Sequence, residues 1–342
     1  MALATNSPVR QKDIAREANV SVMTVSKVVR GCADVAPATR RKILARIKEL
    51  NYRPHFVARS LVSGRTFTIG LVIPDLMYSF FAEISKSIAK VIRPLGYELV
   101  ICNSEEDSKL EGEEIDRLLA RQVDGLILAS AQSPSLGDVI NRVQAANVPF
   151  VLIDRRDPDL RTDFVGVNNK AIGQLATTHL IECGCRRIAH IFGLNLSPGP
   201  GRRAGYVDAL AKHKIPVPDS YLIGAADDQS GYEATKRLLA LDPRPDAIFG
   251  YNDPIAAGAI KAVLEAGFRI PEDIKVIGVG NVHYSDLLRV PLSTIDQSST
   301  LIGEHAANII VQAIGSKVKR RPRVVVLEPL LIVRESTAAR SK

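Results

Sequence analysis

Hydrophobic residues follow two different patterns along this chain, and the change between them comes at about Thr68. Before it, apolar residues are spaced three and four apart, which is the spacing of one face of a helix. From Thr68 onward, short apolar runs rich in β-branched residues alternate with amphipathic segments. The two patterns predict a small all-helical domain followed by a larger α/β body.

The N-terminal pattern predicts two short helices joined by a tight turn within residues 12–30. The second helix has apolar residues on one side and hydroxyls with a cation on the other. Ser21 is placed to cap this helix, which leaves Val22, Met23 and Lys27 at the end that would face a DNA groove. The arrangement is typical of a helix-turn-helix DNA reader.

A third helix is predicted from Pro37 to about Leu50, and a short linker follows it. The helix should pack on the first two through residues at helical spacing, which are Ile43, Leu44, Ile47 and Leu50. Residues 53–66 open with proline and close near glycine, and a helix this short is marginal in water. We therefore expect a linker that folds only with a partner, with Leu61 either exposed for insertion or docked on the body.

The apolar runs of the body form two series and a final run, which we interpret as strands. They lie at residues 69–74, 98–102, 125–128 and 150–154, then at 187–193, 247–250 and 275–279, and last at 330–333. Apolar strands separated by helices are typical of parallel sheets covered on both faces. Two such series predict two α/β lobes with a cleft between them, where ligands usually bind beyond the carboxyl ends of the strands.

The positive charge of the chain is concentrated at its N-terminus. The 342 residues have a net charge of +8, but the first 65 residues alone hold 13 Lys or Arg and 4 Asp or Glu, so the remainder is nearly neutral. Neutralisation of phosphates is the main electrostatic source of nucleic-acid affinity. A basic head on a neutral body therefore favours DNA binding over a merely solvated basic surface.

Other sequence features exclude several classes of protein. The first residues lack the charged and apolar regions of a signal peptide, and no run is long enough to span a bilayer, so we expect a cytoplasmic protein. The four cysteines show no CxxC spacing, and the closest pair, Cys183 and Cys185, has no further ligands nearby. We expect reduced structural thiols, no metal site and no cofactor.

Ten short motifs give a more specific indication. They read DIAREANVS at 13–21, TVSKV at 24–28, ELNYRP at 49–54, ARSL at 58–61, IGLVIPD at 69–75, VDGLIL at 123–128, HLIECG at 179–184, RRIA at 186–189, ND at 252–253 and IPEDI at 270–274. In this order they resemble the LacI/GalR family of bacterial transcription regulators over nearly the whole chain. The resemblance implies a homodimer whose two heads read a pseudo-palindromic operator in double-stranded DNA, on a body like a type I periplasmic binding protein.

The resemblance assigns DNA contacts to residues of the head and the linker. It places Val22, Met23 and Lys27 against base edges in the major groove, where Lys27 can donate to guanine and the other two offer apolar contact. Backbone contacts fall on Ser21, Thr24, Ser26 and Arg30. Minor-groove contacts of the hinge helix fall on His55, Ala58, Arg59 and Leu61. The family often has asparagine where this chain has Arg30 and His55, so the operator sequence stays open.

The resemblance also implies a small-molecule effector pocket between the lobes. The matching positions are Phe80, Phe81, Asn168, Arg202, Asn252, Gly280 and Asn281. Sugar-binding relatives usually have aspartates at 168 and 280, whose carboxylates accept hydrogen bonds from sugar hydroxyls. Because both are absent while Arg202 is present, we expect a less negative pocket. The effector should be a sugar or a sugar derivative, and we expect an anionic one, such as a sugar acid or sugar phosphate. The alternative role for Arg202 is a structural ion pair between the lobes.

The expected domains are a headpiece at 1–52, a hinge helix at 53–66 and an effector-binding and dimerisation body at 67–342. The first lobe would comprise about 67–166 and 295–322, and the second about 167–294 and 323–337. Dimer contacts should include the helix around 81–88, and a tail without leucine heptads after residue 333 makes a tail-mediated tetramer unexpected. Paired hinge helices would link the effector to DNA binding, with either an inducer or a corepressor.

Two other classes of function fit the sequence less well. A solute receptor would share the body, but it needs export and leaves the basic head unexplained. An enzyme would need a catalytic motif, and the chain lacks GxSxG, a P-loop, HExxH and a strand-linked GxGxxG. We therefore expect a DNA-binding regulator, most simply a repressor, that is not an enzyme.

Overall fold

The computed structural model describes residues 9–29, 32, 34–52, 64–131, 137–157, 160–193, 198–316 and 321–338. Internal contacts divide the chain into two compact units, Met1–Thr66 and Phe67–Lys342. Arg30 and most of the expected hinge helix, with His55, Ala58, Arg59 and Leu61, lie outside the described residues. Among the described residues, no helix combines the length and apolar character that crossing a lipid bilayer requires.

The N-terminal unit contains the three expected helices. They are α1 (Gln11–Ala18), α2 (Val22–Val29) and α3 (Pro37–Glu49). Their apolar sides meet in a small core of fully buried Ile14, Val25 and Ile43. Leu44 does not join this core, because it is 49% exposed. Ile47 and Leu50 pack against the core but are only partly buried.

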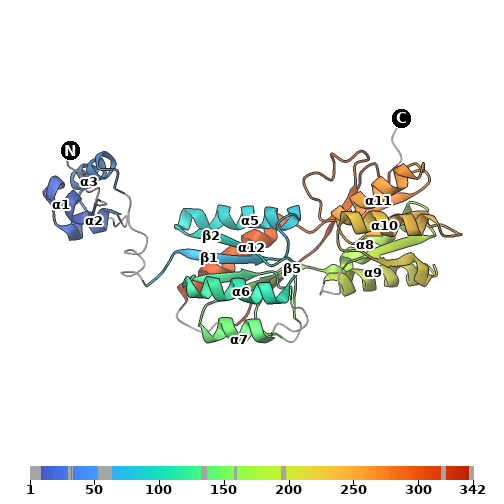
Figure 1. Ribbon diagram of the computed structural model, residues 1–342, viewed down its shortest axis with the longest axis horizontal. Helices are drawn as coiled ribbons and strands as arrows, with labels where there is room; N and C mark the ends of the chain where they lie inside the picture. The colour runs from blue at the N-terminus through green and yellow to red at the C-terminus, as the bar shows by residue number, and fades with distance from the viewer. Residues whose placement is uncertain are drawn as a thin grey trace, which may run out of the picture. The chain divides into compact units, whose positions relative to one another are not determined.

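The first lobe of the body is a six-stranded parallel sheet between two layers of helices (Figure 1). Its strands are β1 (Thr68–Ile73), β2 (Glu98–Asn103), β3 (Gly125–Leu128), β4 (Phe150–Ile153), β5 (Asp163–Val167) and β11 (Val324–Leu327), in the order β11-β5-β4-β3-β1-β2. Helices α5 (Ser79–Ile92) and α12 (Ser299–Gly315) cover one face, and α6 (Ser108–Ala120) and α7 (Gly137–Ala145) cover the other. Both faces are therefore buried, as the continuous apolar runs predict.

The second lobe repeats this architecture with a sheet of its own. Its strands are β6 (Ile188–Phe192), β7 (Leu222–Gly224), β8 (Ala247–Gly250), β9 (Lys275–Val279), β10 (Ser293–Asp296) and β12 (Leu330–Ile332), in the order β12-β10-β9-β8-β6-β7. Helices α8 (Asn169–Glu182) and α9 (Pro198–Lys212) pack on one face, and α10 (Asp228–Leu239) and α11 (Asp253–Glu265) pack on the other. Only β12 is antiparallel to its neighbour among the described strands.

The chain passes from one lobe to the other three times. It crosses after β5, again between β10 and α12, and finally between β11 and β12. The expected return to the second lobe at residue 323 is wrong, because Val324–Leu327 pairs in parallel with β5 of the first sheet. The expected entry into the first lobe at 295 is also early, since β10 continues the second sheet to Asp296.

Candidate functional site

The N-terminal end of α2 is held by the expected cap. The Thr24 backbone N–H donates to Ser21 Oγ at 3.1 Å, and the two side-chain hydroxyl oxygens lie 2.8 Å apart. Val22 and Met23 follow the cap and are 47% and 65% exposed. Two exposed apolar side chains next to each other on a short helix form a surface that suits contact with thymine methyl groups.

Lys27, the expected base donor, already has a partner on the headpiece. Its Nζ donates to Asp34 Oδ2 at 2.6 Å, and the two side chains are 40% and 56% exposed. Sequence reasoning missed Asp34, although it is a rare acidic residue in a basic segment. In this state the ammonium group of Lys27 is oriented by a carboxylate that also opposes approach of DNA phosphates.

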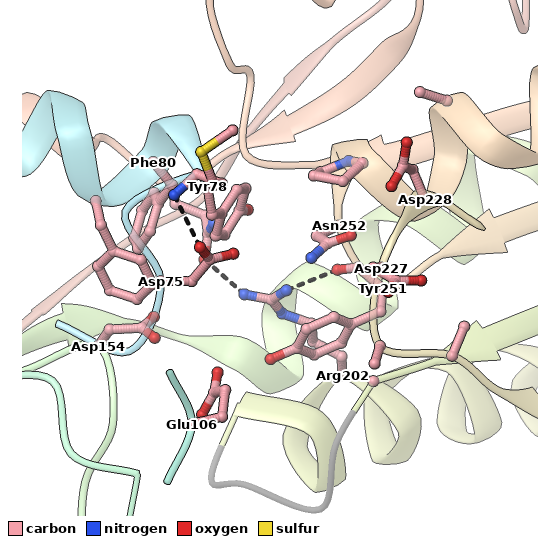
Figure 2. Close-up of a pocket in the computed structure, with 18 of the residues that line it drawn as sticks. Asp75, Tyr78, Phe80, Glu106, Asp154, Arg202, Asp227, Asp228, Tyr251 and Asn252 are labelled. Carbon is pink, nitrogen blue, oxygen red and sulfur yellow. Dashed lines mark hydrogen bonds between the residues drawn. The ribbon is translucent and has the colours of Figure 1, made fainter. Parts of the chain in front are cut away.

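A cavity of about 430 Å³ lies between the two lobes of the body (Figure 2). A volume in this range fits one small-molecule ligand. The residues that line it are Asp75, Met77, Tyr78, Phe80, Phe81, Glu106, Asp154, Arg155, Gly193, Arg202, Ala225, Ala226, Asp227, Asp228, Tyr251, Asn252, Pro254, Ala257, Tyr284 and Gln297. They come from the carboxyl ends of strands in both sheets and from the helices that follow.

Four of the seven expected effector residues line this cavity, namely Phe80, Phe81, Arg202 and Asn252. The other three are not among its lining residues. Asn168 caps α8 through its Oδ1, which accepts from the Ala171 N–H at 3.1 Å. Asn281 is engaged on both sides of its amide, by Asp296 and by Arg334. Gly280 has no side chain, and the Tyr78 hydroxyl lies over it.

Arg202 is almost completely buried and is bound by the protein itself. Its Nε donates to Asn169 Oδ1 at 3.0 Å, its Nη1 to the Tyr251 carbonyl at 2.7 Å, and its Nη2 to Gln297 Oε1 at 2.6 Å. Its guanidinium carbon also lies 4.5 Å from the centre of the Tyr251 ring. These hydrogen-bond partners are neutral oxygens, so they do not support the alternative of a structural ion pair. Three of its five N–H donors are used before any ligand arrives.

The charged residues of the cavity make it acidic. Five lining residues are carboxylates and two are guanidiniums, and the Arg155 guanidinium is paired with Glu106 through two hydrogen bonds of 2.7 and 2.5 Å. The expectation of a less negative pocket compared this chain with sugar-binding relatives, and it stays a prediction. It followed only positions 168 and 280, whereas the acidic groups come from other loops, at Asp75, Asp154, Asp227 and Asp228.

Asp154 is a buried carboxylate with one oxygen, Oδ2, 3.9 Å from Arg155 Nε. It follows β4 in a three-residue turn, where the Arg155 N–H donates to the Ile153 carbonyl and Asp154 has a left-handed φ of 59°. Its Oδ1 is buried without a hydrogen-bond partner among the described residues. Burial raises the pKa of this carboxyl above its ordinary value, although the positive charges of Arg155 and Arg202 oppose the rise. Strain and an unmet acceptor in one residue are typical of a binding site.

Asp227 also lines the cavity, but its carboxylate, unlike that of Asp154, is hydrogen-bonded. Its carboxylate caps α10 and accepts from the Ser230 N–H at 2.8 Å and from the Ser230 hydroxyl at 2.6 Å. These hydrogen bonds lower the pKa of Asp227 below its ordinary value. Asp227 therefore stays ionised and adds a fixed negative charge beside the cavity.

The comparisons with known proteins agree with this architecture. Residues 66–333 match the family model described as periplasmic binding proteins and sugar binding domain of the LacI family, and residues 11–55 match the model of bacterial regulatory proteins of the lacI family. The chain belongs to the LacI family of bacterial transcription regulators. Members of this family are DNA-binding regulators with an effector-binding domain and are not enzymes.

Individual relatives cover nearly the whole chain. The HTH-type transcriptional repressor PurR of Haemophilus influenzae is 36% identical over 331 residues, which are 95% of this chain and 97% of the relative. PurR of Pasteurella multocida is 34% identical over 96% of this chain and 98% of its own length. Among solved structures, the Lac repressor dimer bound to operator and an anti-inducer is 29% identical, covers 97% of this chain and 100% of that one, and gives a TM-score of 0.85. This LacI-family chain is therefore a DNA-binding repressor by its relatives as well as by its fold.

Proposed function

We propose that this LacI-family repressor binds a pseudo-palindromic operator as a homodimer in the cytoplasm, and that a small molecule in the interlobe cavity controls its affinity for DNA. The observation that carries the proposal is the cavity itself, because its wall contains side chains from both lobes. A ligand that contacts both lobes favours one angle between them. A population shift of this kind needs only differential affinity for the two arrangements.

In this proposal Val22 and Met23 contact apolar base edges in the major groove, and Lys27 leaves Asp34 to donate to a guanine. Ser21, Thr24, Ser26 and Arg30 contact phosphates. The hinge residues His55, Ala58, Arg59 and Leu61 bind the minor groove once two copies meet there. Because few groups read bases directly, DNA shape contributes much of the specificity.

For the effector we propose an uncharged ring molecule rich in hydroxyl groups, of the size of a sugar. The carboxylates of Asp75, Asp227 and Asp228 repel an anion but accept hydrogen bonds from hydroxyls. The half-buried aromatic ring of Tyr251 offers a flat apolar surface on which a sugar ring can lie. Asn252 caps α11 through its Oδ1, which leaves its amide N–H groups able to donate to the ligand.

Two relatives support this ligand class. A structure of the regulator CelR in complex with cellobiose is 29% identical to this chain, covers 96% of it and gives a TM-score of 0.73. A LacI-family regulator from Enterococcus faecium with bound ribose is also 29% identical, over 79% of this chain, with a TM-score of 0.71. Both ligands are neutral sugars, whereas the acidic wall disfavours the sugar acid or sugar phosphate expected from sequence.

The test combines ligand screening with DNA binding. Thermal unfolding of the full chain is measured with neutral sugars, the corresponding sugar acids, sugar phosphates and purine bases, because a ligand that binds only the folded state raises the unfolding temperature. Any compound that stabilises the chain is then added to a gel-shift assay with DNA from upstream of its own gene. We expect stabilisation by a neutral sugar, and a change in operator affinity caused by the same compound.

Control measurements separate the parts of the proposal. Met23→Ala should weaken operator binding without changing the ligand response, and Asp154→Asn should weaken the ligand response without changing DNA binding in the absence of ligand. Stabilisation by acids alone would refute the ligand class. A chain that binds sugar but no DNA under any ligand or salt condition would indicate a solute receptor or sensor instead.

A further inference from the structure

Tyr78 connects the two lobes at the edge of the cavity. It is the residue before α5, and its ring lies 5.6 Å from the ring of Phe80 and 5.8 Å from that of Phe81, nearly perpendicular to the latter. From this first-lobe position its hydroxyl reaches the second lobe, where Oη lies 3.4 Å from the carbonyl oxygen of Val279. That distance is long for a hydrogen bond, so packing of the Tyr78 ring must hold the contact as much as the polar interaction does.

The surface that receives the Tyr78 hydroxyl is the backbone of Gly280. This glycine has a φ of +137°, which L-residues rarely adopt. A Cβ added to it would lie 2.9 Å from Tyr78 Oη, closer than real Cβ contacts, whereas its next neighbours, Val282 Cγ1 and Asp253 Oδ2, would be at 3.4 and 3.5 Å. The phenol oxygen of Tyr78 is therefore the one close obstacle to a side chain at 280 among the described residues.

The backbone around Gly280 cannot retreat from this contact. Fully buried Asp253 accepts from the Val282 N–H at 3.0 Å, from the Ser285 hydroxyl at 2.7 Å and from the Thr294 hydroxyl at 2.6 Å. The Gly280 N–H itself donates to a carbonyl of the neighbouring strand β10 at 2.9 Å. A side chain at 280 would therefore have to displace Tyr78.

The Tyr78 ring is also held on its own side. Val282 and Tyr284 of the second lobe pack on the same aromatic cluster of the first lobe. Burial and the nearby Asp253 carboxylate raise the pKa of Tyr78 well above its ordinary value, so the phenol stays neutral. It can donate to the Val279 carbonyl and brings no charge into the cavity.

From this geometry we propose that Tyr78 is a specificity-determining residue of the effector cavity and that Gly280 is its required partner. The Tyr78 hydroxyl occupies the space that a side chain at 280 would otherwise fill, and the Tyr78 side chain, as part of the cavity wall, limits the size of the ligand. The proposal concerning ligands rests on the proposed function, whereas the pairing of Tyr78 with Gly280 is a property of the protein without ligand.

A double-mutant cycle on the full chain without ligand tests the pairing. The four proteins are the wild type, Tyr78→Phe, Gly280→Ala and the double variant, and thermal unfolding is measured for each. Tyr78→Phe removes only the oxygen that would clash, while the backbone strain of alanine at 280 is common to both backgrounds. We expect Gly280→Ala to lower the unfolding temperature by about 2–4 °C more in the wild-type background than in the Tyr78→Phe background.

Gly267→Ala is the matched control for strain. Gly267 also has a left-handed φ, +82°, but a Cβ there would meet no atom within 4 Å. Gly267→Ala should therefore change the unfolding temperature by the same amount in the wild-type and Tyr78→Phe backgrounds. Equal losses from Gly280→Ala in the two backgrounds would overturn the pairing, whether or not any sugar binds.

A second measurement tests specificity. Affinities for a monosaccharide that stabilises the wild type, and for a disaccharide that contains it, are compared between the wild type and Tyr78→Ala. We expect the variant to shift the affinity ratio at least several-fold towards the disaccharide, an effect that general loss of stability would not produce. An unchanged affinity ratio would overturn the specificity role of Tyr78 and leave the proposed function standing. If no sugar stabilises the chain, the proposed function fails, and the double-mutant cycle still tests the pairing of Tyr78 with Gly280.

Discussion

Replacing Asp154 with asparagine should make the protein more stable while impairing its response to ligand. The wild-type carboxylate has a buried Oδ1 without a hydrogen-bond partner among the described residues, and its backbone adopts a left-handed φ of 59°. Asparagine removes the buried charge and tolerates that backbone conformation better than most residues. Removing a charged group that lacks a hydrogen bond should stabilise the unliganded chain by about 1–2 kcal/mol. The attraction to Arg155, whose Nε lies 3.9 Å from Asp154 Oδ2, is lost as well and subtracts from this gain.

The gain from Asp154→Asn should depend on pH with a defined sign. The folded-state pKa of Asp154 is raised above its ordinary value of 3.8, mainly by burial. The folded protein therefore holds this proton longer than the unfolded chain, and wild-type stability falls as the pH rises from the ordinary pKa to the raised one. The variant lacks this fall. The difference in free energy of unfolding between Asp154→Asn and the wild type should be small at acidic pH. It should grow between the ordinary and the raised pKa and then stay constant.

The assay is urea unfolding of both proteins at several pH values, with Asp227→Asn as the control. Asp227 lines the same cavity, but its carboxylate is hydrogen-bonded to Ser230 and its pKa is lowered. Asp227→Asn should therefore destabilise the protein by about 0.3–1 kcal/mol, because it removes a negative charge from a helix N-terminus. This loss of stability should vanish as the pH falls through the lowered pKa of Asp227. The reasoning is refuted if Asp154→Asn destabilises the chain as Asp227→Asn does, or if its effect is independent of pH.

Three further substitutions test other contacts. Ser21→Ala removes the cap of α2 and should cost the headpiece about 1 kcal/mol, measured by hydrogen exchange of its amides during urea titration. Asp34→Asn frees Lys27 and removes a negative charge, so operator affinity in fluorescence anisotropy should rise a few-fold, an effect absent in a Lys27→Ala background. Arg202→Lys leaves buried acceptors such as the Tyr251 carbonyl unpaired and should cost about 2–4 kcal/mol in urea unfolding.

Each of these three predictions has an outcome that contradicts it. Unchanged exchange rates in the first turn of α2 would show that the Ser21 hydroxyl does not act as a cap. If Asp34→Asn raises operator affinity equally with and without Lys27, the Asp34 carboxylate acts by repelling DNA directly and not through Lys27. Arg203 is an exposed neighbour on α9, so Arg203→Lys should change stability by less than about 0.5 kcal/mol. A similar loss from both arginine substitutions would contradict the buried hydrogen-bond network.

Regular periodicity predicted most of the fold. The strands found from sequence are those with continuous apolar runs, such as Ile69–Ile73 and Ala247–Gly250. Four of the described strands were not predicted. β5 and β11 are short apolar strands, and β7 has three residues. β10 reads Ser-Thr-Ile-Asp, and its two hydroxyls are buried because Thr294 donates to Asp253 and Ser293 is hydrogen-bonded to Thr337. Burial through side-chain hydrogen bonds leaves no hydrophobic pattern to detect.

The site was predictable only in part. Four residues that line the cavity were assigned to it through the family resemblance, namely Phe80, Phe81, Arg202 and Asn252. Asp154 and Tyr78 were missed because their importance comes from an unmet hydrogen bond and from a contact across lobes, which depend on the folded structure. A signal for Asp154 did exist, since it directly follows an apolar strand on the side where parallel sheets bind ligands.

The most direct test of the proposed function is the reciprocity between ligand and operator. The dissociation constant of the stabilising sugar is measured by titration calorimetry with and without a saturating operator fragment, and operator affinity is measured with and without saturating sugar. If the cavity controls the headpieces, the operator must change the sugar affinity by the same factor by which the sugar changes the operator affinity. The two factors are equal because one coupling free energy links both binding events. A sugar affinity that the operator leaves unchanged would contradict control of DNA binding by this cavity.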